Sequence, residues 1–397
     1  MKEHQKMKVL APDHLKSTFG RRQFFAMSAG VGAAVALAGC GSNSGSGSGS
    51  EPGDSTGDGA APATGAAGAT GSVSVYDYAQ YTAPENVTGI SDDVGIDVVF
   101  DYFSSPDETI AKLQLADGTA GYDVVIVTDV WVPQMIEMGL LAPIDRSILA
   151  NFANVDPFYL DRPWDPDNKH TIPKAIGTTG IIYDTSVIES PIASWEDFFD
   201  AAASEPVSGQ VSLLDISATL LGIGFAMAGK SAQEVEVDDV AASEQLLSER
   251  LIPHVKAFDT YPSAGLLAGD FVLAQVFSGD ARTVVVEDPE RFKWVLPEGR
   301  PVLWMDSYAV SASAPNPTAA HAYIDYMLRP DVSVGDVSYH GYNTGVRGIQ
   351  EDLGDVPAPE IIFLPVEDLE RTVPSFLARP QQQIVDAYNR LKAGAGS

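Results

Sequence analysis

Short apolar strands alternate with helical segments along most of this chain, and this alternation restricts the fold to the α/β class. Residues 72–78, 96–102 and 122–128 have the alternating or apolar pattern of strands. Helical patterns follow at 105–118 and 131–139. The run 122–128 is apolar throughout, as expected of a parallel strand buried on both faces. This part of the chain therefore predicts strand–helix–strand units.

The same alternation continues toward the C-terminal end, where we find no internal repeat of 20–50 residues. We expect further strands at 181–183, 210–215, 270–277, 283–287 and 303–311. We expect helices at 217–228, 317–327 and 380–392. The body from about residue 73 to 397 is long enough for two domains.

The N-terminal segment has the pattern of an export signal. Residues 1–22 are polar and basic, and the apolar stretch 24–39 is shorter than the roughly 20 residues that a bilayer span needs. Arg21-Arg22-Gln23-Phe24-Phe25 resembles the twin-arginine export motif. Leu37-Ala38-Gly39-Cys40 resembles the bacterial lipobox, in which the cysteine is lipidated. We therefore expect residues 1–39 to be removed and Cys40 to become a lipidated N-terminus.

Residues 41–72 consist largely of Gly, Ser, Ala, Thr and Pro, with almost nothing to bury. This composition is typical of a flexible tether. Residues 40–72 thus predict a lipid anchor and a tether that hold a folded body at the outer face of the cytoplasmic membrane or in the periplasm.

Composition excludes several classes of function. The chain has 54 acidic and 24 basic residues, and its net charge of −30 disfavours a nucleic-acid partner. Its single cysteine excludes intrachain disulfides and thiolate zinc sites, and the six histidines lack metal-ligand spacing. Gly222-Ile223-Gly224 lies inside a predicted helix, which favours close helix packing over a dinucleotide-binding turn. We find no catalytic constellation and expect no cofactor or metal.

An ordered series of segments resembles the spermidine/putrescine-binding proteins of bacterial importers, and the resemblance spans about residues 73–395. The matching segments are 121–147, 151–157, 162–168, 171–173, 194–197, 304–307, 328–331 and 341–342. The resemblance implies a two-lobed periplasmic-binding-protein fold, in which each lobe is a mixed sheet flanked by helices.

The resemblance also implies two hinge crossings, near 176–182 and 303–309. One lobe would then combine 73–178 with 306–355, and the other would combine 179–304 with 356–397. A ligand bound between the lobes closes them, and the closed form, expected to be a monomer, docks on the permease subunits of an ABC transporter.

A polyamine site needs aromatic faces along the alkyl chain and carboxylates at its charged ends. Family positions can be matched here one at a time, with Asp129 close to one of them. The matched positions are Tyr78, Gln80, Tyr81, Thr128, Phe277, Trp304, Asp306 and Tyr342. Trp304 and Asp306 are two residues apart and therefore share one face of their strand.

The sequence departs from the family at the turn 213–219, where relatives present carboxylates to a second amine. Here the aligned residues are Ile216 and Thr219, and Asp215 is the acid nearby. An ammonium without a partner costs several kcal/mol of desolvation. Either Asp215 or Asp129 substitutes, or the ligand has one cationic head, or it is not a polyamine.

We therefore expect a binding lipoprotein that captures a small cationic solute, with putrescine and spermidine as the leading ligands, and not an enzyme. Another small amine or an amino-acid-like compound is the alternative within this class. A secreted enzyme or a surface protein without a transport role is the alternative from other classes.

Overall fold

The computed structural model describes residues 69–103, 106–115, 121–375 and 380–395. The expected signal peptide, the lipidation site Cys40 and most of the tether lie outside these residues. Within them, no helix combines the length and the apolar character that a membrane span requires.

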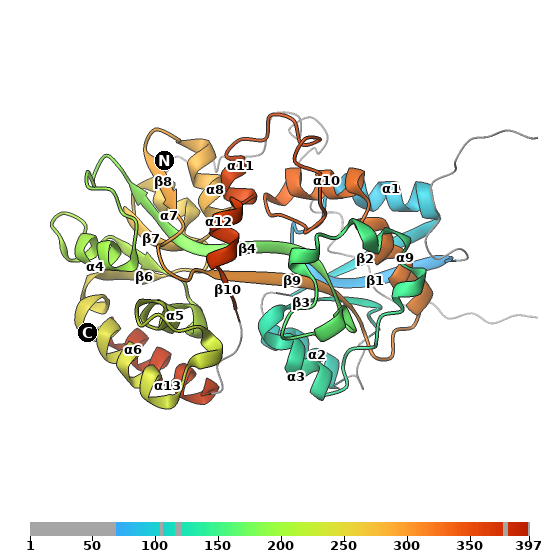
Figure 1. Cartoon of the computed structure of the whole chain (residues 1–397), viewed down its shortest axis with the longest axis horizontal. Coiled ribbons are helices and arrows are strands. Elements are labelled where there is room, and N and C mark those ends of the chain that lie inside the picture. Colours follow the sequence, from blue (N-terminus) through green and yellow to red (C-terminus); the bar gives the residue numbers. More distant parts are fainter. Residues whose placement is uncertain (1–68, 104–105, 116–120, 376–379, 396–397) are drawn as a thin grey trace, which may run out of the picture. The chain divides into compact units, whose positions relative to one another are not determined.

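One part of the molecule is built on a parallel arrangement of three strands (Figure 1). These strands are β1 (Gly71–Tyr78), β2 (Ile96–Phe103) and β3 (Val124–Thr128). β1 pairs in parallel with both of its neighbours. The helices α1 (Pro84–Val94) and α2 (Pro106–Leu115) follow β1 and β2 along the chain, so each parallel pair is joined through a helix.

Two long strands continue the sheet into the other part of the molecule (Figure 1). β9 (Val302–Val310) pairs antiparallel with β3, and β4 (Thr171–Asp184) pairs antiparallel with β9. Beyond residue 178, β4 pairs with β7 and β8 instead. The full order is β2-β1-β3-β9-β4-β7-β5-β6, with β8 on β4 and β10 on β9. The remaining strands are β5 (Val211–Leu213), β6 (Val255–Phe258), β7 (Leu273–Phe277), β8 (Phe292–Val295) and β10 (Val373–Pro374).

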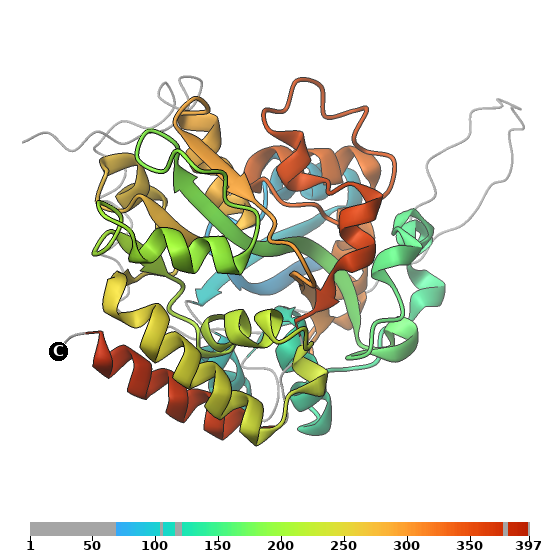
Figure 2. The ribbon, with the colours of Figure 1, turned by 60° about the vertical axis from the view of Figure 1, so that its left-hand side comes forward.

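Helices flank both parts of this sheet, and α6 and α13 lie side by side in Figure 2. Their starts have identifiable caps: the Ser194 side chain and Asp197 form a capping box on α4, and Asn316 caps α9 ahead of Pro317. The helices beyond α2 are α3 (Val132–Glu137), α4 (Trp195–Ala203), α5 (Ser217–Met227), α6 (Val237–Arg250), α7 (Ser263–Ala268), α8 (Ser278–Glu287), α9 (Pro317–Met327), α10 (Pro330–His340), α11 (Pro359–Ile362), α12 (Val366–Arg371) and α13 (Gln381–Gly394).

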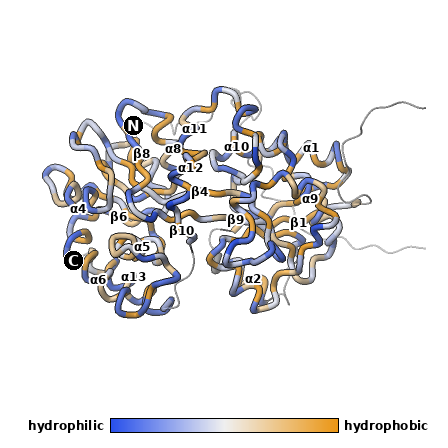
Figure 3. Tube along the Cα trace, in the orientation of Figure 1, coloured by the Kyte–Doolittle hydropathy of each residue, from blue (hydrophilic) through white to orange (hydrophobic). Residues whose placement is uncertain are grey.

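In the described part of the chain, the buried apolar side chains form three clusters. Apolar residues follow the central strands β4 and β9 in Figure 3. The first core surrounds β1, β3, β9 and α9 and includes Tyr76, Ile126 and Tyr323. The second core lies among α4, α5, α6 and α13 and includes Phe198. The third core lies between β7, α8 and β8 and includes Val284.

Most of the expected elements are confirmed, including the strands 72–78, 96–102 and 122–128 and the helix 317–327. The strand expected at 283–287 is wrong, because this segment belongs to the helix α8. Its Thr-Val-Val-Val sequence favours a strand locally, but burial of Ala281 and Val284 in the third core stabilises the helix.

The glycines of α5 provide a test of close helix packing. A methyl group on Gly224 would lie within 3.0 Å of Ser243 on α6, including its Cα, whereas one on Gly222 would meet nothing within 4 Å. We expect Gly224→Ala to lower the free energy of unfolding by about 1–3 kcal/mol. Gly222→Ala, the matched control, should leave it unchanged or raise it by up to about 1 kcal/mol. Urea denaturation of both variants checks this; equal effects would contradict the packing explanation.

Candidate functional site

Asp306 lies at the point where β3, β9 and β4 run side by side, opposite Thr128 on one neighbour and Ala175 on the other. The Thr128 hydroxyl donates a hydrogen bond to Oδ1 at 2.6 Å, and the Tyr81 hydroxyl donates one to Oδ2 at 2.8 Å. The side chain is buried. Burial raises the pKa of Asp306, and the two hydrogen bonds partly oppose this shift. The result is a desolvated carboxylate that is held in a fixed orientation.

A continuous series of aromatic rings leads to this carboxylate. Phe277 on β7 contacts Trp304 on β9 with ring centroids 5.7 Å apart, and Trp304 contacts Tyr342 at 5.0 Å. Tyr342 lies 6.3 Å from Tyr81, which lies 5.6 Å from Tyr78. These distances suit edge-to-face packing of aromatic rings. The series connects β7, which borders the third core, with β1 of the first core.

Two glycines allow these rings to approach the backbone. A methyl group on Gly177 of β4 would lie within 3.0 Å of the Trp304 indole, and one on Gly279 of α8 would lie within 3.0 Å of the Tyr342 ring. Trp304 Nε1 is buried and has no hydrogen-bond partner among the described residues. A buried N–H donor without an acceptor destabilises the folded protein unless another group accepts a hydrogen bond from it.

The structure thus brings together seven of the residues that the sequence singled out. They are Tyr78, Tyr81, Thr128, Phe277, Trp304, Asp306 and Tyr342. We call this set the ring–carboxylate cluster. Gln80 lies in the turn after β1, where it is exposed and has a left-handed φ of 61°.

Asp129 is fully buried and is engaged by the protein itself. Its Oδ1 accepts from the Val130 amide and, at 2.6 Å, from the Ser375 hydroxyl, and its Oδ2 accepts from the Met305 amide. Asp129 therefore ties the end of β3 to β9 and to the segment after β10. Two of its three donors are backbone amides, so this carboxylate has a structural role at the end of β3.

Asp215 and Thr219 lie apart from the hydrogen bonds and ring contacts of the cluster. The Asp215 carboxylate pairs with Lys392 and Tyr388 of α13. Thr219 stands in the first turn of α5, where its carbonyl accepts from Gln275 at 3.0 Å. Asp215 thus has a cationic partner of its own, which leaves it poorly suited to replace the missing acids of the family.

Asp280 is an acid that the sequence reasoning missed. It lies in the first turn of α8, beside Gly279, and accepts from the Ser263 amide at 3.2 Å. Burial raises its pKa to about 6. Burial raises the pKa of Tyr342 and of Tyr261, and the charges of Asp280 and Asp306 add to both shifts. The sequence signal was an acid three residues after Phe277, where β7 ends. It was missed because a strand was expected at 283–287, where the structure has the helix α8.

Lys174 on β4 was also missed. It is fully buried, and its Nζ donates to the Tyr81 carbonyl at 2.6 Å and lies 3.7 Å from the Asp77 carboxylate. The signal was a charged residue inside an otherwise apolar segment, since lysine is rarely buried without a partner.

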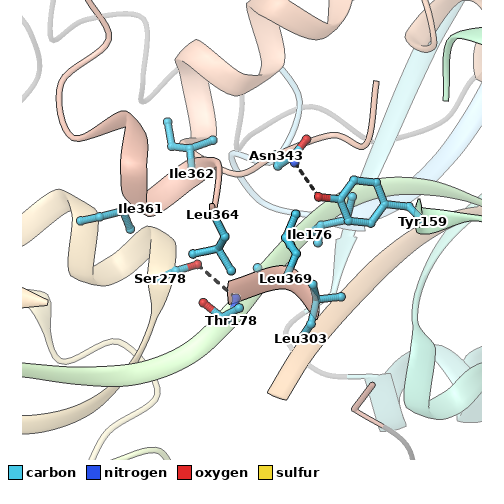
Figure 4. A pocket seen from close by; sticks show the side chains of 11 residues that line it. Tyr159, Ile176, Thr178, Ser278, Leu303, Asn343, Ile361, Ile362, Leu364 and Leu369 are labelled. Carbon is cyan, nitrogen blue, oxygen red and sulfur yellow. Dashed lines mark hydrogen bonds between the residues drawn. The ribbon is translucent and has the colours of Figure 1, made fainter. Parts of the chain in front are cut away.

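A small cavity lies near the cluster but does not include Asp306 (Figure 4). Its volume is about 10 Å³, enough for about one water molecule. Side chains of β4 and β9 and of the segment from Ile361 to Leu369 surround it. The Thr178 amide donates to the Ser278 hydroxyl at its wall, and Asn343 donates to the Tyr159 hydroxyl. This cavity is too small for an organic ligand.

A mixed sheet continued through two shared strands, with rings and a buried carboxylate where they meet, is an arrangement suited to reversible binding of a small solute. The chain matches the family of bacterial extracellular solute-binding proteins over residues 85–347, and it belongs to this family.

Among its relatives is the putrescine/agmatine-binding protein of Pseudomonas aeruginosa, which is 27% identical over 361 residues, covering 85% of this chain and 96% of that protein. The putrescine/cadaverine-binding protein of the same organism is 30% identical over 279 residues, covering 68% of this chain and 77% of that protein. A solved spermidine/putrescine ABC transporter substrate-binding protein from Streptococcus pneumoniae superposes with a TM-score of 0.72 at 23% identity, over 82% of this chain and 99% of that one. The expected family and the two-lobed periplasmic-binding-protein fold are thereby confirmed.

Proposed function

We propose that this protein captures a small organic cation for an ABC importer, with putrescine-type amines as the first candidates. The observation that carries the proposal is the buried Asp306 carboxylate at the end of a series of aromatic rings. Rings attract an ammonium group through their faces, and the carboxylate neutralises it. Relatives named for putrescine, agmatine and cadaverine support the same class of ligand. Capture proceeds without chemical turnover.

The two lobes that close on the ligand are proposed to be 73–178 with 306–355 and 179–304 with 356–397. The separation of the first core from the second and third cores supports this division. β4 and β9 are then the hinge strands, and the ring–carboxylate cluster lies where they meet. Bound ligand contacts both sides and favours closure.

Within this site Asp306 binds the first ammonium group, and Trp304, Phe277 and Tyr342 line its alkyl chain. Asp280 receives a second ammonium, in place of the family carboxylates that Ile216 and Thr219 replace. Its position next to Gly279, which packs against Tyr342, supports this role. Ligand roles for Asp129 and Asp215 have less support, because Asp129 accepts backbone amide hydrogen bonds that tie β3 to β9 and Asp215 pairs with Lys392.

A second candidate is a ligand with one ammonium and a polar, amino-acid-like end. The observation that favours it is the uncharged pair Ile216 and Thr219, both half-buried at the start of α5. Such a ligand would place its ammonium at Asp306 as well.

We further propose that the protein is exported through its twin-arginine signal and anchored by lipid at Cys40. An extracellular solute-binding family supports export. Anchoring beside the permease would keep the monomeric receptor close to its partner. Release of the protein into the medium by a Cys40→Ala variant would support the anchor, whereas retention in the membrane fraction would contradict it.

A thermal-shift panel tests the proposed ligand class. Putrescine, cadaverine, agmatine, spermidine, single amines and amino acids are each added to the purified protein. A ligand at a hundredfold its dissociation constant should add about 2.7 kcal/mol of stability. We expect a diamine to raise the melting temperature most. A shift with amino acids and none with diamines would favour the second candidate. Failure of every tested cation to raise the melting temperature would overturn the proposal.

Binding of a diamine should release a proton at acidic pH. Burial raises the pKa of Asp280 to about 6, and a neighbouring ammonium favours its ionised form, so bound ligand lowers this pKa. Affinity should therefore be highest above pH 6 and fall by up to about tenfold for each unit below it. Calorimetry at pH 5.5 in two buffers of different ionisation enthalpy measures the released proton. Asp280→Asn should abolish that release; an unchanged release would assign it to another group.

A further inference from the structure

Lys174 is held against the back of the ring–carboxylate cluster. Its Nζ lies 4.4 Å from the centre of the Tyr81 ring, a cation–π distance, and donates to the Tyr81 carbonyl at 2.6 Å. The same Tyr81 donates its hydroxyl to Asp306. One face of the Tyr81 ring is therefore already occupied by a cation of the protein, and this ring serves as a hydrogen-bond donor to Asp306.

Lys174 interacts electrostatically with the buried carboxylates of Asp77, Asp306 and Asp336. They are 0%, 6% and 1% exposed, so water screens their charges poorly. Asp77 accepts from the Tyr78 amide at 2.7 Å and the Thr82 hydroxyl at 3.1 Å.

Asp336 accepts from the Ala83 amide and the Asn86 side chain, both at 2.8 Å. His340 and Tyr308 also face Lys174, but His340 stays neutral because burial lowers its pKa, and burial likewise keeps the Tyr308 hydroxyl protonated. When these three acids are ionised, Lys174 thus reduces their summed charge from −3 to −2.

Resting on the proposed function, we propose that Lys174 is a specificity-determining residue: a built-in ammonium group that repels the ammonium of the ligand and so limits how tightly the Asp306 end of the site binds organic cations. The lysine acts across the Tyr81 ring and does not touch the ligand. A receptor that must release its ligand to a permease needs such a limit, because two or three uncompensated carboxylates would retain a diamine too long.

The competing explanation is that Lys174 only holds the turn 78–82 in place through its contacts with Tyr81, Thr82 and Asp77. The two explanations predict opposite signs. If Lys174 is merely structural, its removal weakens binding of any ligand. If its charge opposes the ligand, its removal strengthens binding of a cation.

A charge-balance cycle separates them. Dissociation constants for putrescine and butylamine are measured by calorimetry at pH 8.5 for the unaltered protein and for Lys174→Met, Asp77→Asn and the double variant. We expect Lys174→Met to bind putrescine about tenfold more tightly and Asp77→Asn about tenfold more weakly. The double variant, which restores the original charge, should return to within about threefold of the unaltered protein. The gain with Lys174→Met should be smaller for butylamine, which carries one charge.

If Lys174→Met does not fold, the comparison of the other two variants decides: the double variant should bind about tenfold more tightly than Asp77→Asn. Weaker binding by Lys174→Met, or a double variant no tighter than Asp77→Asn, would overturn the inference while leaving the proposed function intact. Absence of amine binding by the unaltered protein would instead overturn the proposed function, and this inference with it.

Discussion

Replacing Asp306 with asparagine should weaken binding of putrescine by about a hundredfold or more. Asparagine has nearly the same shape and can still accept a hydrogen bond from Tyr81 or Thr128, so the substitution removes the charge and leaves the packing in place. Loss of one partner from a buried charge pair costs about 2–5 kcal/mol, and about 1.4 kcal/mol corresponds to a factor of ten. Calorimetric titration of the variant with putrescine measures the loss.

The matched control is Asp215→Asn. This carboxylate is partly exposed and pairs with Lys392 on α13, so its replacement should change putrescine affinity by no more than about twofold. Affinity unchanged in Asp306→Asn, or reduced equally in both variants, would remove Asp306 from the ligand site.

The same substitution should not destabilise the protein without ligand. Burial raises the pKa of Asp306, so the ionised form is less favourable in the folded chain than in the unfolded chain. This cost is absent below the unfolded pKa and develops as the pH rises through the folded pKa. At neutral pH the neutral asparagine avoids it. A higher melting temperature with weaker binding would identify Asp306 as a residue kept for function at some expense of stability.

The sequence predicted the strands of the first core well because their apolar patterns are local. β4 was predicted only at 181–183, although it begins at Thr171. Pro173 and Lys174 interrupt the apolar pattern there, and the register shifts between Pro173 and Ala175, where a proline is tolerated at an irregularity. α8 was mistaken for a strand because β-branched residues favour extended structure locally, whereas its burial depends on distant residues.

The candidate site was predictable where one strand or one family segment carries the information. Trp304 and Asp306 are two residues apart on β9 and therefore lie on the same face of the strand. The family resemblance supplied Tyr81, Phe277 and Tyr342. Asp280 and Lys174 were missed because their positions depend on pairing across the sheet: Lys174 reaches Tyr81 from β4, and Asp280 lies near Tyr342 through the packing of α8. Asp129 looked like a ligand-facing loop acid, yet Ser375, far along the chain, engages it.

Gly279→Ala should weaken putrescine binding by about fivefold to 150-fold while changing the stability of the ligand-free protein little. Gly279 is buried at the start of α8, and Tyr342 packs directly on it. A methyl group there lies within 3.0 Å of the Tyr342 ring, so the ring must move away from Trp304, whose centroid is 5.0 Å away. Overpacking of this kind typically costs about 1–3 kcal/mol.

In the proposed two-lobed arrangement this cost falls mainly on the closed, ligand-bound form, because α8 and Tyr342 belong to opposite lobes. Without ligand the lobes can separate and relieve the clash, and alanine is a better helix former than glycine. Thr283→Ala, one turn further along α8 and exposed, is the matched control and should bind putrescine within about twofold of the unaltered protein. Stopped-flow measurements should assign the loss in Gly279→Ala to faster dissociation. Equal stability loss with and without putrescine would show that the contact persists in the open form, and would contradict its role in closure.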